Sequence, residues 1–355
     1  MKTEHVALTN KVIELLKQLI EIPSLSGEEN KTASHIADFL KKEGIESKRK
    51  LNNVWAYNRN YDSAKKTILL NSHHDTVKPN SGWTYDPFKA TVENGKLIGL
   101  GSCDAGASLV SLLAAFFYFY NQKNLKYNLI FSATAEEETT GENSIRAVLP
   151  DLEPFDFAIV GEPTGMEMAI AEKGLIVLNC QANGVSGHAA RGNGINAITK
   201  AIEDINWFTN YSFPKESKVL GPVRMSVTGI NGGIQHNVIP DKCTFLVDIR
   251  STDAYTNSEI LEIIKKNISS DIVRASDNLN PTSVPENHIL VETAKKLNVP
   301  RFASPTMSDQ AQINKPSVKM GAGLSERSHT ADEFVYLSEI EDGVEKYIHL
   351  LEKIL

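Results

Sequence analysis

Residues 67–75 read Thr-Ile-Leu-Leu-Asn-Ser-His-His-Asp, a short apolar run that ends in two histidines and an aspartate. Runs of this kind, apolar throughout and followed at once by polar residues, are typical of strands buried on both faces of a parallel sheet. The pattern recurs at 128–138, which ends in Glu136-Glu137-Glu138, and at 155–163, which ends in Gly161-Glu162-Pro163. The nearly all-apolar segment 108–120 predicts a buried helix between the first two strands. We therefore expect an α/β domain with a mostly parallel central sheet and helices on both faces.

The pattern of the chain changes after Lys173. Alternating runs at 175–182, 223–230 and 243–249 predict strands, and amphipathic segments at 195–209 and 258–268 predict helices. Two helices on a small sheet, which we expect to be antiparallel, make an α+β unit. The polar region 270–288 is interpreted as a linker, followed by helix, a short strand at 317–320 and a terminal helix over 332–355. We predict a discontinuous domain, 1–172 plus 289–355, interrupted by an inserted domain, 173–288.

Composition limits the possible partners and the compartment. The chain has 355 residues, a net charge of -7 and no basic block, so a nucleic-acid partner is not expected. Its longest apolar run, Leu109–Tyr120, is shorter than the ~20 residues of a membrane span, so no membrane partner is expected either. The three cysteines, Cys103, Cys180 and Cys243, are far apart and form no CxxC motif. This argues against a disulfide framework, and with no signal peptide expected we predict a cytoplasmic protein.

The polar clusters that follow the predicted strands favour a metal centre. Ligands of open α/β sheets bind at the carboxyl ends of the strands, so these clusters share one edge. Asp104, in the glycine-rich turn 99–104, and His329, after the loop 321–323, can reach the same edge. Singly, each residue has an ordinary explanation: a satisfied buried histidine, a solvated glutamate turn, a helix N-cap or a loop acid. Together, imidazole and carboxylate ligands without thiolate suit zinc, cobalt or manganese, and one carboxylate can bridge two ions ~3.5–4 Å apart.

These motifs resemble the zinc-dependent aminoacylase and carboxypeptidase family that includes acetylornithine deacetylase and succinyl-diaminopimelate desuccinylase. The resemblance spans essentially the whole chain. It rests on His73-His74-Asp75, Gly101-Ser102-Cys103-Asp104, Ala135-Glu136-Glu137-Glu138, Gly161-Glu162-Pro163-Thr164, Gly187-His188, Asn237-Val238-Ile239-Pro240, Asp248-Ile249-Arg250, and His329 with Asp332-Glu333. It implies a metal-binding catalytic domain and an inserted ferredoxin-like domain that serves as a lid and in dimerisation.

The resemblance implies a role for each matching residue. Two divalent ions, zinc or cobalt with manganese as an alternative, are held by His73, Asp104 and Glu162 and by Asp104, Glu138 and His329, with Asp104 bridging. Asp75 orients His73, and Glu137 is the general base. His188 stabilises the oxyanion, often from a partner subunit; its ordinary alternative is a loop histidine before the helix near Asn196. Family members also have a cis peptide after the bridging aspartate, here Asp104-Ala105.

Substrate recognition is assigned to Arg250, Asn237 and the loop Gly321-Ala322-Gly323. Arginine offers a planar fork for a carboxylate, but a salt bridge between Arg250 and Asp248 or Asp253 is an equally concrete alternative. Departures from the family pattern at Leu100, Gly106 and Glu136 touch no proposed ligand and leave the substrate open.

The function implied is hydrolysis of the amide bond of a small N-acyl-L-amino acid by a homodimer joined through the inserted domain. N-acetyl- or N-succinyl-ornithine or -citrulline, in arginine biosynthesis, is the first choice of substrate. The alternatives are an aminopeptidase or dipeptidase and an N-acyl-lysine or N-succinyl-diaminopimelate deacylase. A non-catalytic binding module is disfavoured, because every ligand position and Glu137 are filled.

Overall fold

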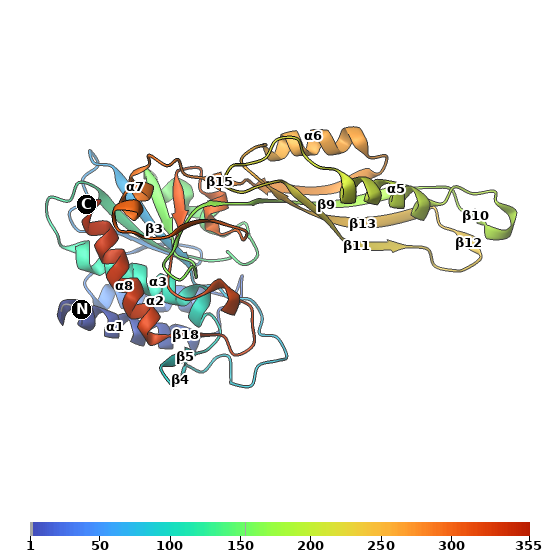
Figure 1. Ribbon diagram of the computed structural model, residues 1–355. Coiled ribbons are helices and arrows are strands. Elements are labelled where there is room, and N and C mark those ends of the chain that lie inside the picture. The colour runs from blue at the N-terminus through green and yellow to red at the C-terminus, as the bar shows by residue number, and fades with distance from the viewer. Residues whose placement is uncertain (1–2, 153) are drawn as a thin grey trace. The chain divides into compact units, whose positions relative to one another are not determined.

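The computed structural model describes residues 3–152 and 154–355, and the chain divides into two compact units. One unit consists of Met1–Ile170, Ser283–Phe302 and Ser308–Leu355, and the other of Ala171–Thr282 and Ala303–Met307. The chain thus leaves the first unit after one segment and returns to it later (Figure 1).

The first unit is built on a sheet whose strand order is β1-β2-β6-β3-β7-β17-β8-β15, with β16 paired to β8. Its four middle strands run parallel: β6 (Asn128–Thr134), β3 (Thr67–His73), β7 (Phe157–Val160) and β17 (Ser317–Lys319). Every residue of β3 and β6 is buried, because both faces of the sheet are covered. Along β3, Ile68 and Leu70 enter one hydrophobic core and Leu69 enters another.

Helices cover both faces of this sheet. The larger core includes side chains of α1 (Thr3–Ile20), α2 (Asn30–Lys42), α3 (Ala107–Tyr120) and α8 (Leu337–Glu352), and α3 packs on both α1 and α8 (Figure 1). The smaller core is closed by α4 (Ile145–Leu152). The stretch Ser102–Tyr120 is long and apolar enough to cross a membrane, but 83% of it is buried, as in the central helix of a globular core.

The remaining elements of the first unit lie at the margins of the sheet and in its loops. They are β1 (Lys48–Lys50), β2 (Asn53–Tyr57), β4 (Thr91–Glu93), β5 (Lys96–Ile98), β8 (Met168–Glu172), β15 (Thr282–Ser283), α7 (Ile289–Lys296), β16 (Arg301–Ser304) and β18 (Phe334–Tyr336). Strands β4, β5 and β18 form a small antiparallel sheet of their own.

The second unit is an antiparallel sheet of order β11-β13-β9-β14 with two helices. Its strands are β9 (Gly174–Asn183), β11 (Arg224–Gly232), β13 (Lys242–Ser251) and β14 (Asp271–Leu279), and its helices are α5 (Ala197–Asn210) and α6 (Asn257–Asn267). Thr256 and Glu259 form a capping box that starts α6. Short strands β10 (Gly187–His188) and β12 (Val238–Ile239) pair beside it.

Two sequence predictions need correction. The region 270–288 is not only a linker, because β14 pairs with β9 as an edge strand; most of its residues are exposed, so it lacks a strong apolar signal. The terminal helix begins at Leu337, and the residues before it form β18. Ser26 donates its hydroxyl to Asp75 Oδ2 over 2.5 Å, and α2 begins at Asn30.

Candidate metal centre

His73 is the last residue of β3, and both of its ring nitrogens have acidic or carbonyl neighbours. Nδ1 lies 3.0 Å from the Asp75 carbonyl, which can only accept, so Nδ1 carries a proton. Nε2 lies 3.3 Å from Asp104 Oδ1 and 3.8 Å from Glu162 Oε1. In a neutral ring, Nε2 would turn its lone pair toward these carboxylate oxygens. A positive charge, either a proton or a cation, must therefore stand between them.

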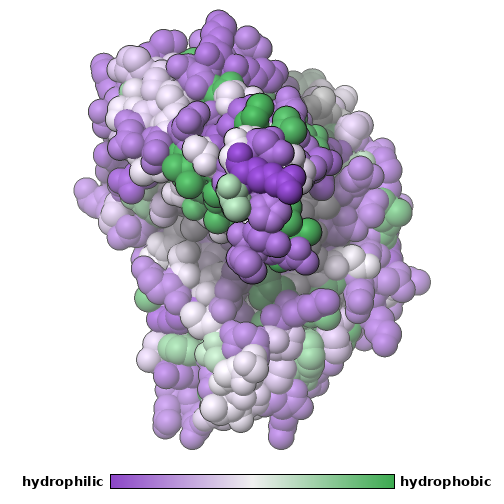
Figure 2. Space-filling model, turned by 90° about the vertical axis from the view of Figure 1, so that its right-hand side faces the viewer, coloured by the Kyte–Doolittle hydropathy of each residue, from purple (hydrophilic) through white to green (hydrophobic). Residues whose placement is uncertain are grey.

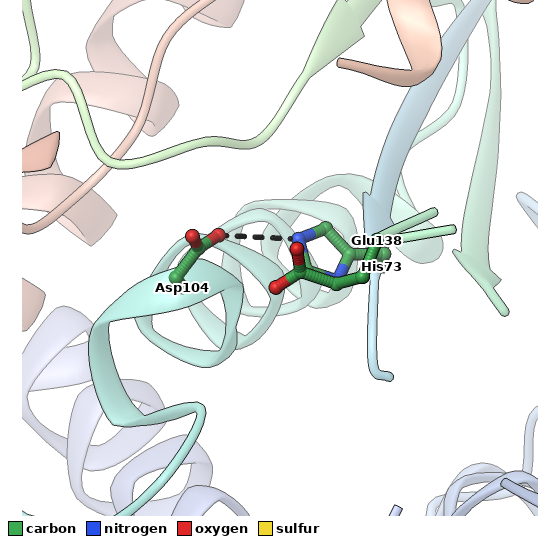
Figure 3. Close-up of side chains that lie close together, drawn as sticks. All are labelled: His73, Asp104 and Glu138. Carbon is green, nitrogen blue, oxygen red and sulfur yellow. Dashed lines mark hydrogen bonds and ion pairs between the residues drawn. The ribbon is translucent and has the colours of Figure 1, made fainter. Parts of the chain in front are cut away.

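His329 continues the same network on the other side of Asp104. Its Nε2 lies 2.9 Å from Glu138 Oε2 and 3.6 Å from Asp104 Oδ2. Contacts of 3.8 Å or less thus connect all five predicted ligands in the order Glu162, His73, Asp104, His329, Glu138. Figure 3 shows His73, Asp104 and Glu138 pointing toward one another from separate elements. The structure therefore brings together every residue predicted to hold metal, while the ligand roles themselves remain predictions.

The donor atoms form two groups that could each hold a cation. In one, His73, Asp104 and Glu138 each offer an atom within 4.8 Å of the others, and in the other His73, Glu137 and Glu162 do so. Glu162 Oε1 is buried and has no hydrogen-bond partner in residues 3–152 and 154–355. Since a buried carboxylate oxygen is costly to leave unpaired, this atom fits the place of a metal ligand.

The electrostatics of the site also fit a cation. Burial, helped by the neighbouring Asp104 and Glu138 and opposed by His73, raises the pKa of Glu162 to about 8. Burial likewise raises the pKa of Glu137 well above its usual range. The hydrogen bond to Glu138 raises the pKa of His329 to about 9. Buried carboxylates crowded in this way are stabilised in their charged form by bound cations.

Asp75 has a wider structural role than orienting His73. Its carboxylate lies 3.4 Å from His73 Nδ1, and it also accepts the backbone N–H groups of Glu137 over 3.1 Å and Glu138 over 3.2 Å. One buried acid therefore connects the end of β3 with the turn that carries Glu137. The Asp104-Ala105 peptide is cis, as the resemblance implies.

Three polar residues at the site were not assigned a role from the sequence. The Ser328 hydroxyl donates to Asp104 Oδ2, and the buried Asp309 accepts from Asn71 Nδ2 over 2.8 Å and Thr134 Oγ1 over 2.6 Å. Glu333 accepts from the turn that carries Asp104. The Asp332-Glu333 motif indicated that Glu333 could belong to the site. Its hydrogen-bond partners could not be predicted, because they depend on the tertiary fold.

The predicted substrate loop 321–323 is buried beneath the Glu162 loop. A Cβ at Gly321 would lie 2.5 Å from the Glu162 carbonyl oxygen, and one at Gly323 would lie 2.6 Å from Cys103 Sγ. Gly323 also has a φ of +88°, which favours glycine. Close packing therefore accounts for both glycines without a ligand.

The predicted residues of the second unit fall into two groups. His188 is exposed, and the Asn237 carbonyl accepts from Ala189 N over 3.0 Å, so the structure brings His188 and Asn237 close together. Arg250 forms a two-point salt bridge with Asp248, at 2.9 Å from Nε to Oδ1 and 3.0 Å from Nη2 to Oδ2. The salt-bridge alternative for Arg250 is thus present in the structure.

A parallel sheet whose carboxyl edge gathers two histidines and four carboxylates, in a chain with an inserted α+β unit, defines a metallohydrolase. The chain belongs to peptidase family M20/M25/M40: the sequence pattern of that family matches residues 69–353.

Named relatives of this chain act on N-acyl amino acids. It is similar to acetylornithine deacetylase of Proteus mirabilis, with 28% identity over an alignment of 375 positions, gaps included, that covers 96% of each chain. It is 31% identical to acetylornithine deacetylase of Yersinia pseudotuberculosis over an alignment of 295 positions, gaps included, that covers 77% of this chain and 75% of the relative. Succinyl-diaminopimelate desuccinylase of Orientia tsutsugamushi is 29% identical over a match that covers 72% of this chain and 71% of the relative.

Solved structures confirm the predicted fold class. Aminopeptidase PepT of Bacillus cereus has a TM-score of 0.78 at 17% identity, over 98% of each chain. The M20 family metallo-carboxypeptidase Sso-CP2 of Sulfolobus solfataricus has a TM-score of 0.73 at 18% identity, over 100% of each chain. The YXEP protein of Bacillus subtilis, described as a dinuclear metal binding peptidase, has a TM-score of 0.70 at 18% identity, over 98% of each chain.

Proposed function

We propose that this chain removes the acyl group from a small N-acyl-L-amino acid, with N-acetyl- or N-succinyl-ornithine or -citrulline as substrate. The observation that carries the proposal is the position of Glu137, whose partly buried carboxylate lies among the ligand candidates with Oε2 4.0 Å from His73 Nε2. The deacylase names of relatives that match 96% of the chain support the substrate class. The proposal includes a cytoplasmic location and a step in arginine biosynthesis.

Two divalent cations fit the donor set. His73, Asp104 and Glu162 would hold one, and Asp104, Glu138 and His329 the other, with Asp104 between them. Zinc and cobalt, or manganese, suit these imidazole and carboxylate donors. When bound, such ions act as Lewis acids and bring the pKa of a water near neutrality.

Glu137 is positioned to move the proton. Burial raises the pKa of Glu137, which makes its ionised carboxylate a stronger base than an exposed one. It accepts a proton from the attacking water and returns it to the leaving nitrogen, so that amide cleavage gives a carboxylate and an amine. Asp75 holds the turn that places this carboxylate, and the Nδ1–H to carbonyl bond fixes the His73 tautomer.

The second unit contributes His188 as donor to the oxyanion, with Asn237 and Arg250 in recognition of the substrate carboxylate. It also supplies the interface of a homodimer. Strand β11 forms one edge of its sheet, and unpaired edges invite pairing with another strand. Exposed apolar residues occur in this unit: Val185, Ile195, Ile230, Ile234 and Val273. In the view of Figure 2, hydrophilic residues cover most of the visible face, with hydrophobic residues scattered among them.

A substrate panel tests the proposal. Acetyl and succinyl forms of ornithine, citrulline, lysine and diaminopimelate are compared with Ala-Ala and Gly-Leu under saturating metal. Turnover of an acyl-ornithine or acyl-citrulline at the highest kcat/KM supports the proposal. Preferred cleavage of the dipeptides would make the chain a peptidase, and a purified chain that retains no zinc, cobalt or manganese between about pH 6 and pH 8 would remove the enzyme assignment.

A further inference from the structure

The carboxylate of Glu333 is buried inside the turn that carries Asp104. Its Oε1 accepts the backbone N–H groups of Cys103 over 2.7 Å and of Asp104 over 2.9 Å, and its Oε2 accepts that of Gly101 over 3.0 Å. The Glu333 side chain is only 2% exposed. Three main-chain donors from one short turn therefore converge on a single carboxylate.

The turn needs these acceptors. Gly101 has a φ of +76°, and the backbone at Asp104 is not helical. Within the turn, Ser102 N bonds to Gly99 O and Gly106 N to Gly101 O, whereas the N–H groups of Gly101, Cys103 and Asp104 are accepted by Glu333. Gly101 and Cys103 are buried, so water is not at hand for their N–H groups. Buried N–H groups without an acceptor are rare and costly. Here the acceptors are the carboxylate oxygens of Glu333, which is at least 229 residues away from these donors in the sequence.

Glu333 is itself held in place by the backbone. Its carbonyl accepts Gly99 N–H over 3.0 Å, and the next residue begins the ladder of β18 with β5, in which Phe334 pairs with Ile98. His329 and Ser328, which contact Asp104, precede Glu333 by a few residues. The segment 328–333 therefore positions Asp104 and His329 together.

We propose that Glu333 is a positioning residue that fixes Asp104 relative to His329, and that its loss weakens the cation site of Asp104, Glu138 and His329, which loses the position of two ligands, more than that of His73, Asp104 and Glu162, which loses one. The inference rests on the metal centre of the proposed function. His73 ends β3 and Glu162 follows β7, whereas Asp104 lies in the turn bonded to Glu333 and His329 lies in the segment that contains Glu333.

Asp332 offers a matched control. It is adjacent to Glu333 and also accepts three hydrogen bonds, but from Thr84 N, Thr84 Oγ1 and Tyr85 N. These bonds hold an exposed loop and not the turn of Asp104. The substitutions Glu333→Gln and Asp332→Asn therefore make the same exchange of a carboxyl for an amide at neighbouring positions with different structural partners.

The test is calorimetric titration of chelator-treated protein with Zn²⁺ or Co²⁺. The wild type is expected to bind two ions per chain. E333Q is expected to bind one of the two ions about 10–100-fold less tightly, with a smaller change in affinity for the other ion. D332N is expected to bind both ions as tightly as the wild type. Activity of E333Q should recover as metal concentration rises, with KM unchanged, which a general loss of structure would not allow.

Wild-type affinity at both sites in E333Q overturns the inference, as does equal weakening of both sites in both variants. If E333Q does not fold, hydrogen exchange of the metal-free wild type is measured instead. The inference requires that the amides of Gly101, Cys103 and Asp104 are protected from exchange. Exchange of these amides as fast as that of open loops overturns the inference. A wild type that binds two ions but cleaves no acyl-amino acid removes the proposed substrate and leaves the role of Glu333 standing.

Discussion

The backbone N–H of Glu137 donates to the Asp75 carboxylate over 3.1 Å, and the Asp75 carbonyl accepts from His73 Nδ1 over 3.0 Å. A single residue thus positions a predicted metal ligand and the predicted general base. Asp75→Asn leaves one acceptor oxygen where the carboxylate had two, so we expect kcat/KM to fall about 10–100-fold, with weaker metal binding. Ser26→Ala, which removes one bond to the same carboxylate, should have a smaller effect. Wild-type turnover in D75N would contradict this role.

Glu137→Gln removes the proton acceptor and keeps the shape of the side chain. We expect a folded protein that binds metal and whose kcat is about 10²–10⁴-fold lower. Glu136→Gln is the matched control, because the Glu136 carboxylate accepts from Asn143 N over 3.0 Å and not from the site. Rates and metal content are measured on the same samples, and unimpaired turnover in E137Q would mean that another group is the base.

Removal of metal should lower thermal stability. Without the ions, the crowded carboxylates of the centre have no positive charge between them. An ion present at about 100 times its dissociation constant adds about 2.7 kcal/mol to the free energy of unfolding, and chelation removes this contribution. Scanning calorimetry before and after chelation measures the shift, and zinc, cobalt or manganese should restore it. An unchanged melting temperature would show that no ion is bound to the folded state in preference to the unfolded one.

The metal-free protein should lose stability as pH rises. Burial raises the pKa of Glu162 to about 8 from 4.5, so its neutral form stabilises the fold fully below the unfolded value and loses this contribution as pH rises through the folded value. Denaturation of the metal-free chain at several values between about pH 5 and pH 8 should show this decline. Glu162→Gln should flatten it, and an equal slope in both proteins would assign the decline to other groups.

His188→Ala should reduce turnover and leave stability and metal content unchanged, because the side chain is exposed and lies in the second unit. His236→Ala, another exposed histidine of the same unit, is the control. Equal activities of the two variants would remove the oxyanion role of His188.

The parts of the fold that sequence could predict are those with a strong local signal. Strands β3, β6 and β7 are buried throughout and have apolar centres because both faces of the sheet are covered, and the acids that follow them mark the edge that holds the site. The gathering of His73, Asp104, Glu138, Glu162 and His329 follows from that shared edge and the family motifs. Strand β14 was missed because most of its residues are exposed, so it lacks a strong apolar signal.

The supporting contacts could not be predicted in the same way. Glu333 meets the turn of Asp104, and Asp309 meets Asn71 and Thr134, from more than 170 residues away along the chain. Nothing in the local pattern around an acid says which distant N–H or hydroxyl group it will accept. The packing of Gly321 and Gly323 under the Glu162 loop is tertiary information of the same kind.

The two edges of the sheet in the second unit differ in regularity. The pairing of β14 with β9 is interrupted twice, between Ile272 and Arg274 and between Ser276 and Leu279, whereas that of β11 with β13 shifts once. Irregular, charged edges resist the addition of another strand. If two copies paired edge to edge along β11, the combined sheet would end in a β14 strand on both sides. Because these edges resist further pairing, the assembly would stop at a dimer and would not grow into a fibre.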